Sequence, residues 1–175
     1  MFVALGGTGK EVLLRLRRRI IQADWGGERL HSIAEFPVAK FFYFDTDTTE
    51  ARESDRAATS DPLYAAVKFT PGETLQKSVN IAKYQRDLRA YPHIEEWLPQ
   101  RDLTSIDASK GAGQVRAISR LLFFDTYTDF VGGVRRKCQE VADNLGREAD
   151  LKRLGLDVGS DIRVVVVMSG AGGTG

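Results

Sequence analysis

Residues 1–16, MFVALGGTGKEVLLRL, contain the pattern that decides the fold. The short apolar run at residues 1–5 predicts a buried strand, and Gly6-Gly7-Thr8-Gly9 predicts a tight turn after it. From residue 10 to residue 23 apolar side chains recur at helical spacing, so we expect a helix directly after the turn. A strand, a glycine turn and a helix in this order are the repeating unit of a parallel α/β sheet.

Two more stretches predict strands of the same sheet. Residues 38–44 (VAKFFYF) are rich in aromatic and β-branched side chains, which favour strands. Residues 161–168 (DIRVVVVM) contain four consecutive valines, which predict a strand buried on both faces. A shorter strand is expected at residues 65–69.

The segments between these strands are mostly helical in pattern. We predict a helix at residues 74–89, a short helix between Pro92 and Pro99, and a long helix at residues 114–147. Gly132-Gly133 is expected to kink or divide the long helix, because glycine weakens a helix interior. The alternation of strands and helices predicts a doubly wound, mainly parallel α/β sheet with helices on both faces, that is, a Rossmann-like fold.

Loops of unusual composition follow the predicted strands. In such sheets ligands bind beyond the carboxyl ends of the strands, and glycine-rich loops there expose backbone amides to an anion. Three glycine loops could together enclose a nucleotide polyphosphate, and two acids could hold Mg²⁺. The alternative is that these residues are ordinary caps and turns. The candidate ligand-binding residues are Gly6, Gly7, Thr8, Gly9, Lys10, Asp45, Thr46, Asp47, Gly111, Ala112, Gly113, Gln114, Ser169, Gly170, Ala171, Gly172, Gly173, Thr174 and Gly175, with Asp45 and Asp47 as the candidate metal ligands.

The first loop matches neither of two common phosphate-binding patterns completely. A Walker loop is excluded, because Ala4 occupies its first glycine position and Glu11 occupies the position of its hydroxyl. A dinucleotide fingerprint would use Gly6 and Gly9 but again meets Ala4. Its acidic ribose partner is expected about 20 residues further on, whereas the second predicted strand ends only at Asp45. Because Gly6 and Gly9 do match this pattern, a dinucleotide-binding module remains an alternative.

Composition excludes several functional classes. The chain has 175 residues, with 25 Lys and Arg against 24 Asp and Glu, so its balance gives no electrostatic footprint for nucleic acid or a membrane surface. No apolar run approaches the roughly 18 residues that span a bilayer, so we expect no membrane insertion. The single cysteine fits a reducing, cytoplasmic setting rather than a disulfide scaffold.

Other conspicuous side chains have structural explanations. His31 and His93 have no second ligand at metal spacing, so no metal site is expected there. Cys138 falls on the apolar side of its predicted helix and is expected to be a small buried hydrophobe. One cluster of cations is predicted to form the solvated face of the first helix rather than an RNA-binding strip: Arg15, Arg17, Arg18 and Arg19.

Four motifs in order resemble the tubulin/FtsZ superfamily of GTP-dependent filament proteins, and in particular its bacterial tubulin-like members. The glycine loop at residues 4–9 is similar to the family's first phosphate loop, and Asp45-Thr46-Asp47 to its second loop. Residues 111–114 (GAGQ) resemble the third loop, and residues 171–175 (AGGTG) the glycine-rich signature after a hydrophobic strand. Arg120 stands where bacterial members have an arginine.

The resemblance implies GTP or GDP as ligand, with Mg²⁺, and self-association into filaments. It adds Glu11 to the candidate ligand-binding residues, because relatives have an amide near the guanine at this position, and it places Ala4 and Ala171 where relatives have glycines. It covers only the amino-terminal part of the family's GTPase domain, so residues 1–175 are expected to be a portion that stops within the fourth loop. The resemblance implies GTPase activity for the full-length polymer. The family's acidic catalytic loop has no counterpart in residues 1–175, so we expect no hydrolysis by this chain alone. The valine strand would then lack its later neighbours in the sheet, so exposed apolar surface is expected near residues 164–167. The alternatives are a Rossmann-type dinucleotide module and a scaffold without nucleotide.

Overall fold

The computed structural model of the chain describes residues 1–48, 61–110, 112, 115–145, 148–159, 161–171 and 174. The strands are β1 (Phe2–Leu5), β2 (Phe41–Asp45), β3 (Thr74–Gln76) and β4 (Val165–Val167). The helices are α1 (Gly6–Gln22), α3 (Tyr64–Val67), α4 (Ile81–Gln85), α5 (Pro92–Glu95), α6 (Arg116–Leu145) and α7 (Glu148–Arg153). Short 3-10 turns are η1 (Ile33–Glu35), η3 (Pro71–Glu73) and η4 (Leu88–Ala90).

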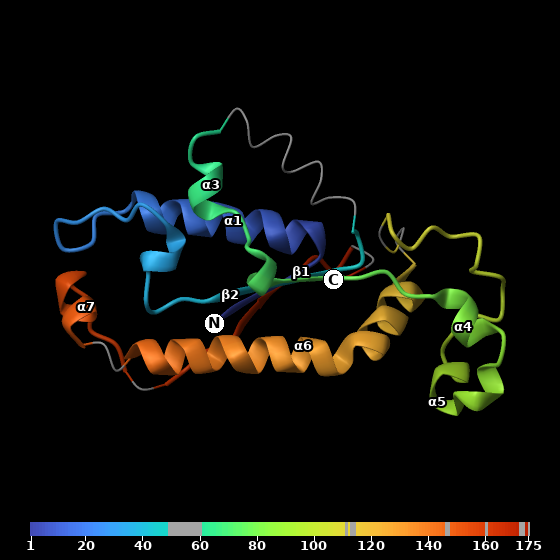
Figure 1. Cartoon of the computed structure of the whole chain (residues 1–175). Helices are drawn as coiled ribbons and strands as arrows, with labels where there is room; N and C mark the ends of the chain where they lie inside the picture. The colour runs from blue at the N-terminus through green and yellow to red at the C-terminus, as the bar shows by residue number, and fades with distance from the viewer. Residues whose placement is uncertain are drawn as a thin grey trace.

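The strands form one parallel sheet in the order β3-β2-β1-β4. β1 lies inside the sheet, since Phe2 is in register with Phe41 of β2 on one side and with Val165 of β4 on the other. α1 runs along one face of this sheet and α6 along the other (Figure 1). The prediction of a parallel α/β sheet with helices on both faces is confirmed.

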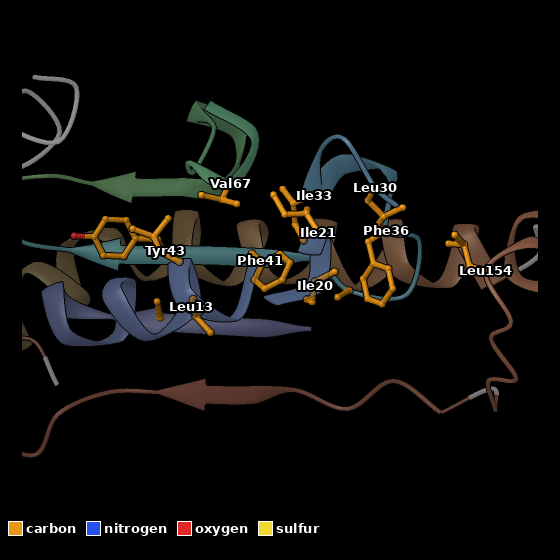
Figure 2. Packing of buried hydrophobic residues seen from close by; sticks show 13 residues of the cluster. Leu13, Ile20, Ile21, Leu30, Ile33, Phe36, Phe41, Tyr43, Val67 and Leu154 are labelled. Carbon is orange, nitrogen blue, oxygen red and sulfur yellow. The ribbon is translucent and has the colours of Figure 1, made fainter. Parts of the chain in front are cut away.

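β2 is buried on both faces and divides the core into two parts. Its side chains alternate, so Phe41 and Tyr43 pack with α1 while Phe42 and Phe44 pack with α6. Figure 2 shows the α1 side, where Phe41 and Tyr43 lie close to Leu13. The aromatic side chains of β2 contact α1 on one face and α6 on the other. The run that predicted this strand therefore also packs both helices against the sheet.

Two elements between β2 and α5 differ from the sequence prediction. The strand expected at residues 65–69 is wrong, because this segment carries the single helical turn of α3. The helix expected at residues 74–89 is also wrong at its start, where β3 pairs with Tyr43–Asp45 of β2. Only its middle is α-helical, in α4. A free edge of β2 was available to residues 74–76, and pairing with it outweighed their helical spacing.

The last helix and the last strand have the expected type, but β4 is shorter than the strand expected at residues 161–168, since only Val165–Val167 are extended and paired. α6 continues through Gly132 and Gly133 as one helix, so the expected division into two helices does not occur. β4 lies at the edge of the sheet, and Val164, Val165 and Val166 are 49%, 44% and 53% exposed. Burial on both faces was therefore the wrong expectation, whereas the exposed apolar surface near residues 164–167 is confirmed. β1 covers only one edge of this strand.

Candidate functional site

The first glycine loop is the first turn of α1. The helix begins at Gly6, whose φ of +71° lets β1 pass directly into it, so the separate turn predicted before residue 10 is wrong. Leu5 holds the N-cap position and makes no side-chain hydrogen bond to the first turn. Backbone N–H groups and the positive end of the helix dipole thus lie at the carboxyl edge of the sheet, where an anion can bind them.

Gly9 serves the packing of α1 on the sheet. A Cβ atom at this position would lie 2.4 Å from the carbonyl oxygen of Val167 and 3.3 Å from the Cα atom of Ala4. Helix and strands therefore approach each other more closely than any larger residue permits. Gly7 is half-buried and Thr8 is exposed, so these two positions are the more open part of the loop.

The next two positions of α1 have opposite environments. Lys10 is buried, and its ammonium lies 5.6 Å from the centre of the Tyr43 ring. Glu11 is exposed. Of the two, only Lys10 lies within the body of the protein close to the end of β2.

Asp45 and Thr46, at the end of β2, meet the fourth loop. Asp45 is 4% exposed, and its Oδ1 atom accepts hydrogen bonds from the backbone N–H of Thr46 at 2.7 Å and from the hydroxyl of Thr174 at 3.0 Å. Its Oδ2 atom accepts the hydroxyl proton of Tyr43 at 2.7 Å. The hydroxyl oxygens of Thr46 and Thr174 are 3.1 Å apart. Loops that are 128 residues apart in the sequence therefore share one hydrogen-bonded group.

The second loop also meets the segment that leads into the third. The backbone N–H of Thr48 donates to the carbonyl of Ser109 at 2.9 Å, and Asp47 forms an antiparallel bridge with Lys110. The side-chain amide of Gln76 donates to the carbonyl of Asp47 at 2.8 Å. These contacts place the second loop between β3 and the residues Ser109 and Lys110.

The third and fourth loops are described only in part. Ala112 is buried, and Ser169 and Gly170 follow β4, with the backbone N–H of Ala171 donating to the Ser169 hydroxyl at 3.2 Å. The remaining candidates lie outside the described residues: Gly111, Gly113, Gln114, Gly172, Gly173 and Gly175.

Two arginines of α6 lie near this edge. The guanidinium of Arg116 donates to the carbonyl of Gly170 and so ties the start of α6 to the fourth loop. Sequence reasoning missed Arg116, although its place just after the third glycine loop was a usable signal. The guanidinium of Arg120, which the family resemblance singled out, lies 4.3 Å from the centre of the Trp97 ring.

Cavities border the carboxyl edge on both faces of the sheet. On the α1 face a cavity of about 480 Å³ is lined by residues that include Lys10, Tyr43 and Gln76. On the α6 face a cavity of about 510 Å³ is lined by residues that include Arg116 and Thr174. Space of this size is within the usual range for small-molecule sites.

Metal binding would need help from a ligand. Within the described ranges, no group of three or more His, Cys, Asp or Glu side chains is arranged to hold a metal ion. Mg²⁺ commonly takes one or two carboxylates and completes its shell with phosphate oxygens and water. Asp45 at the end of β2 and Asp47 just after it fit that pattern of ligation, provided that a nucleotide supplies the phosphates.

Comparison with known proteins identifies the family. The sequence matches the family described as "Tubulin like" over residues 1–175. The chain belongs to the tubulin-like family. No curated protein and no solved structure matches it. This tubulin-like chain thus combines the family's sequence pattern with a parallel sheet whose loops meet at one edge. In the part that the structure describes, no helix is long and apolar enough to cross a bilayer.

Proposed function

We propose that this tubulin-like chain binds a guanine nucleotide, GTP or GDP, at the carboxyl edge of its sheet. The observation that carries the proposal is the hydrogen-bonded group of Asp45, Thr46 and Thr174, which brings the loop after β2 to the loop after β4. The uncapped first turn of α1 opens at the same edge. Several backbone N–H groups can then face one polyphosphate, which is the role that glycine-rich loops have in anion binding.

The metal and the higher assembly follow from the same proposal. Mg²⁺ would be held mainly by the phosphates, with Asp47 as the carboxylate that contacts the ion directly or through water. Membership of the family supports self-association of nucleotide-bound chains into filaments and a cytoplasmic location. Sedimentation of the chain with GTP and Mg²⁺, compared with GDP, tests the self-association.

The binding test compares fluorescent GTP with ATP and NAD on the same protein. Gly7 is half-buried in the opening turn of α1, so Gly7→Val places a branched side chain where the phosphates would approach. We expect GTP binding to the wild type and a loss of about tenfold or more in Gly7→Val, because backbone amides near the anion are blocked.

A matched control separates this effect from loss of folding. Gly132 lies in α6 with nothing within 4 Å of an added Cβ, so Gly132→Ala should bind GTP like the wild type. Circular dichroism should show the same helix content in all three proteins. NAD binding without GTP binding would overturn the proposal in favour of a dinucleotide module, and binding of none of the three ligands would favour a scaffold.

A further inference from the structure

The side chain of Thr174 is held by Asp45, the last residue of β2, and by Thr46, which follows it. Its hydroxyl oxygen lies 3.0 Å from Asp45 Oδ1 and 3.1 Å from the hydroxyl oxygen of Thr46. Asp45 and Thr46 are 4% and 1% exposed, so the acceptor and its neighbour are fixed inside the protein. Thr174 itself is partly buried. A rigid pair at the end of β2 thus holds a residue of the fourth loop.

Each hydroxyl has one proton to donate, and this limits the arrangement. Asp45 is acceptor-only when ionised, so the Thr174 hydroxyl donates to Asp45. The Thr46 hydroxyl is then the donor to Thr174, because its 3.4 Å distance to Asp45 is the longer of its two contacts. While these bonds last, the Thr174 hydroxyl has no proton left for a phosphate oxygen.

The carboxylate of Asp45 is also occupied by the backbone of its own loop. Besides the Thr174 hydroxyl, Oδ1 accepts the N–H of Thr46 at 2.7 Å and the N–H of Asp47 at 3.3 Å. Oδ2 accepts the Tyr43 hydroxyl. A buried carboxylate with this many donors is stabilised as an anchor for the chain around it.

The fourth loop has a second anchor four residues earlier. The guanidinium of Arg116 donates to the carbonyl of Gly170, which fixes the start of the loop to α6. Gly170 and Thr174 are thus each tied to a different element, one to α6 and one to the end of β2. The two ends of this stretch are thus held before any ligand arrives.

We propose that Asp45 is a positioning residue, which holds the fourth glycine loop through the Thr174 hydroxyl so that the loop's backbone N–H groups receive the phosphates. The proposal rests on the proposed nucleotide site and refines it. Thr174 contributes its hydroxyl to the loop's position and not to a phosphate oxygen. Asp45 is not a ligand of Mg²⁺, and Asp47 is the carboxylate that serves the ion.

The first test needs no nucleotide and measures amide hydrogen exchange in residues 169–171. Thr174→Val and Asp45→Asn should each accelerate exchange by about tenfold. Thr174→Val removes the donor of the charge-assisted hydrogen bond, and Asp45→Asn removes the charge of its acceptor and replaces one carboxylate oxygen by an amide donor. The double variant should exchange no faster than the faster single variant, since both remove the same contact. Thr174→Ser keeps the hydroxyl, so its exchange should be as slow as that of the wild type. The comparison of Thr174→Ser with Thr174→Val remains informative even if Asp45→Asn folds poorly.

Two results of this first test would overturn the proposal. One is unchanged exchange in Thr174→Val. The other is an acceleration in the double variant equal to the product of the two single accelerations, which would mean that the side chains act independently.

The second test measures GTP affinity with and without Mg²⁺. Thr174→Val and Asp45→Asn should weaken binding by the same factor in both conditions, about tenfold, and non-additively when combined. Asp47→Asn should weaken binding only when Mg²⁺ is present. If Asp45→Asn abolished the effect of Mg²⁺, Asp45 would be a metal ligand and the proposal would fail.

A remaining outcome distinguishes this inference from the proposed function. Suppose that Thr174→Val weakened GTP binding as much in the Asp45→Asn variant as in the wild type. The hydroxyl would then bind phosphate, and the inference would be wrong. If the wild type bound no GTP, the proposed function would fail, while the exchange measurements would still decide whether Asp45 holds Thr174.

Discussion

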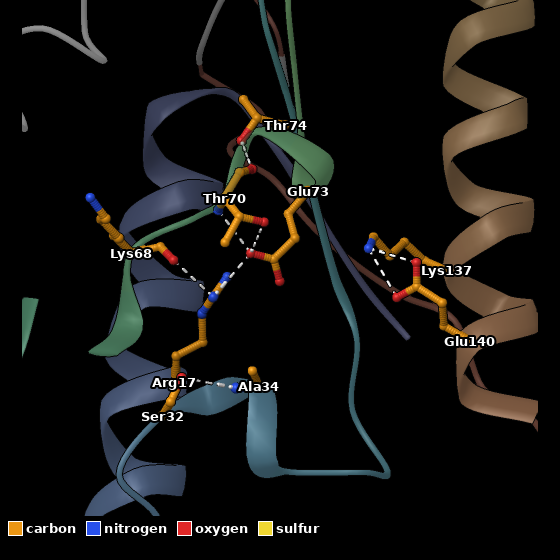
Figure 3. Close-up of polar contacts among 9 residues, drawn as sticks. All are labelled: Arg17, Ser32, Ala34, Lys68, Thr70, Glu73, Thr74, Lys137 and Glu140. Carbon is orange, nitrogen blue, oxygen red and sulfur yellow. Dashed lines mark hydrogen bonds and ion pairs between the residues drawn. The ribbon is translucent and has the colours of Figure 1, made fainter. Parts of the chain in front are cut away.

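The guanidinium of Arg17, in α1, donates a 3.1 Å hydrogen bond to the carboxylate of Glu73, which lies 56 residues away in η3 (Figure 3). Arg17 is 1% exposed, and its guanidinium lies between the rings of Phe41 and Phe69, at 4.9 and 4.5 Å from their centres. It also donates to the carbonyl of Lys68 at 2.9 Å. Burial lowers the pKa of Arg17, while the charge of Glu73 opposes that change. The expectation of a solvated Arg17 is therefore wrong.

Removal of Arg17 should be strongly destabilising. Among the described residues, Arg17→Ala leaves the Glu73 carboxylate without a cation and with only Thr70 as its hydrogen-bond partner, in a site that is largely closed to water. Breaking a buried ion pair costs about 3–5 kcal/mol. The free energy of unfolding in urea measures the loss. Arg15 is exposed on the same helix, so Arg15→Ala should change that free energy by less than about 0.5 kcal/mol. Equal losses in the two variants would contradict the role of the buried pair.

Neighbouring glycines of α6 should respond to alanine with opposite signs. A Cβ at Gly133 would lie 2.4 Å from the Phe42 ring, so Gly133→Ala must displace a core side chain and should cost about 1–3 kcal/mol. A Cβ at Gly132 meets nothing within 4 Å, so Gly132→Ala should stabilise the helix by up to about 1 kcal/mol. Thermal and urea unfolding of both variants check this. A stabilising Gly133→Ala would mean that α6 does not approach β2 this closely.

Tyr84 should make stability fall at alkaline pH. Its hydroxyl donates to Asp125 between α4 and α6, and burial first, then this hydrogen bond, raise the pKa of Tyr84 above its usual value near 10. The folded state thus retains the proton that the unfolded state loses, so the contribution is complete below about pH 10 and is lost as pH rises further.

The measurement is urea unfolding of the wild type and Tyr84→Phe between pH 8 and pH 11. At pH 8 the wild type should be more stable by about 1 kcal/mol, the usual worth of one hydrogen bond, and the gap should narrow above about pH 10. Tyr127 is 56% exposed on α6, so Tyr127→Phe serves as the control for loss of a tyrosine hydroxyl. A gap that stayed constant to pH 11 would refute the link to Tyr84 ionisation.

The exposed edge strand should promote association of the chain. β4 lies at the sheet edge with Val166 53% exposed, and an apolar edge strand is a template for pairing with another chain. Val166→Lys should reduce concentration-dependent light scattering and change the unfolding free energy by less than about 1 kcal/mol. Val167 packs against the core on the α1 side, so Val167→Lys should cost about 2 kcal/mol or more. Unchanged scattering by Val166→Lys would exclude this edge as the cause.

Local pattern was sufficient where an element is long or chemically uniform. Three segments could be recognised from sequence as strands followed by loops. They are the apolar run before the glycines at residues 6–9, the aromatic run of β2 and the valines around β4. The length of α6 likewise follows from its repeated apolar positions. The two glycines inside it do not interrupt the helix, because Gly133 packs against Phe42 at a distance that a side chain would not allow.

Local pattern was insufficient where three or four residues adopt a structure that a neighbour determines. Thr74–Gln76 form a strand because they pair with the edge of β2. A periodicity within three residues cannot predict this pairing. Arg17 is buried because η3 places Glu73 and the adjoining segment places Phe69 beside α1. Spacing within one helix reports which side chains share a face but not what covers that face.

The candidate site shows the same division. The sequence by itself determined that glycine-rich or acidic loops follow strands of one parallel sheet, because strand propensity, glycine's freedom and the rule for parallel sheets are all local or general. Only the tertiary structure decided that Asp45 meets Thr174, that Gly9 packs against β4 and that Arg116 reaches the fourth loop. The physical reason is that hydrogen bonds and close packing act over a few ångströms, and only the folded chain brings residues 129 positions apart within that range.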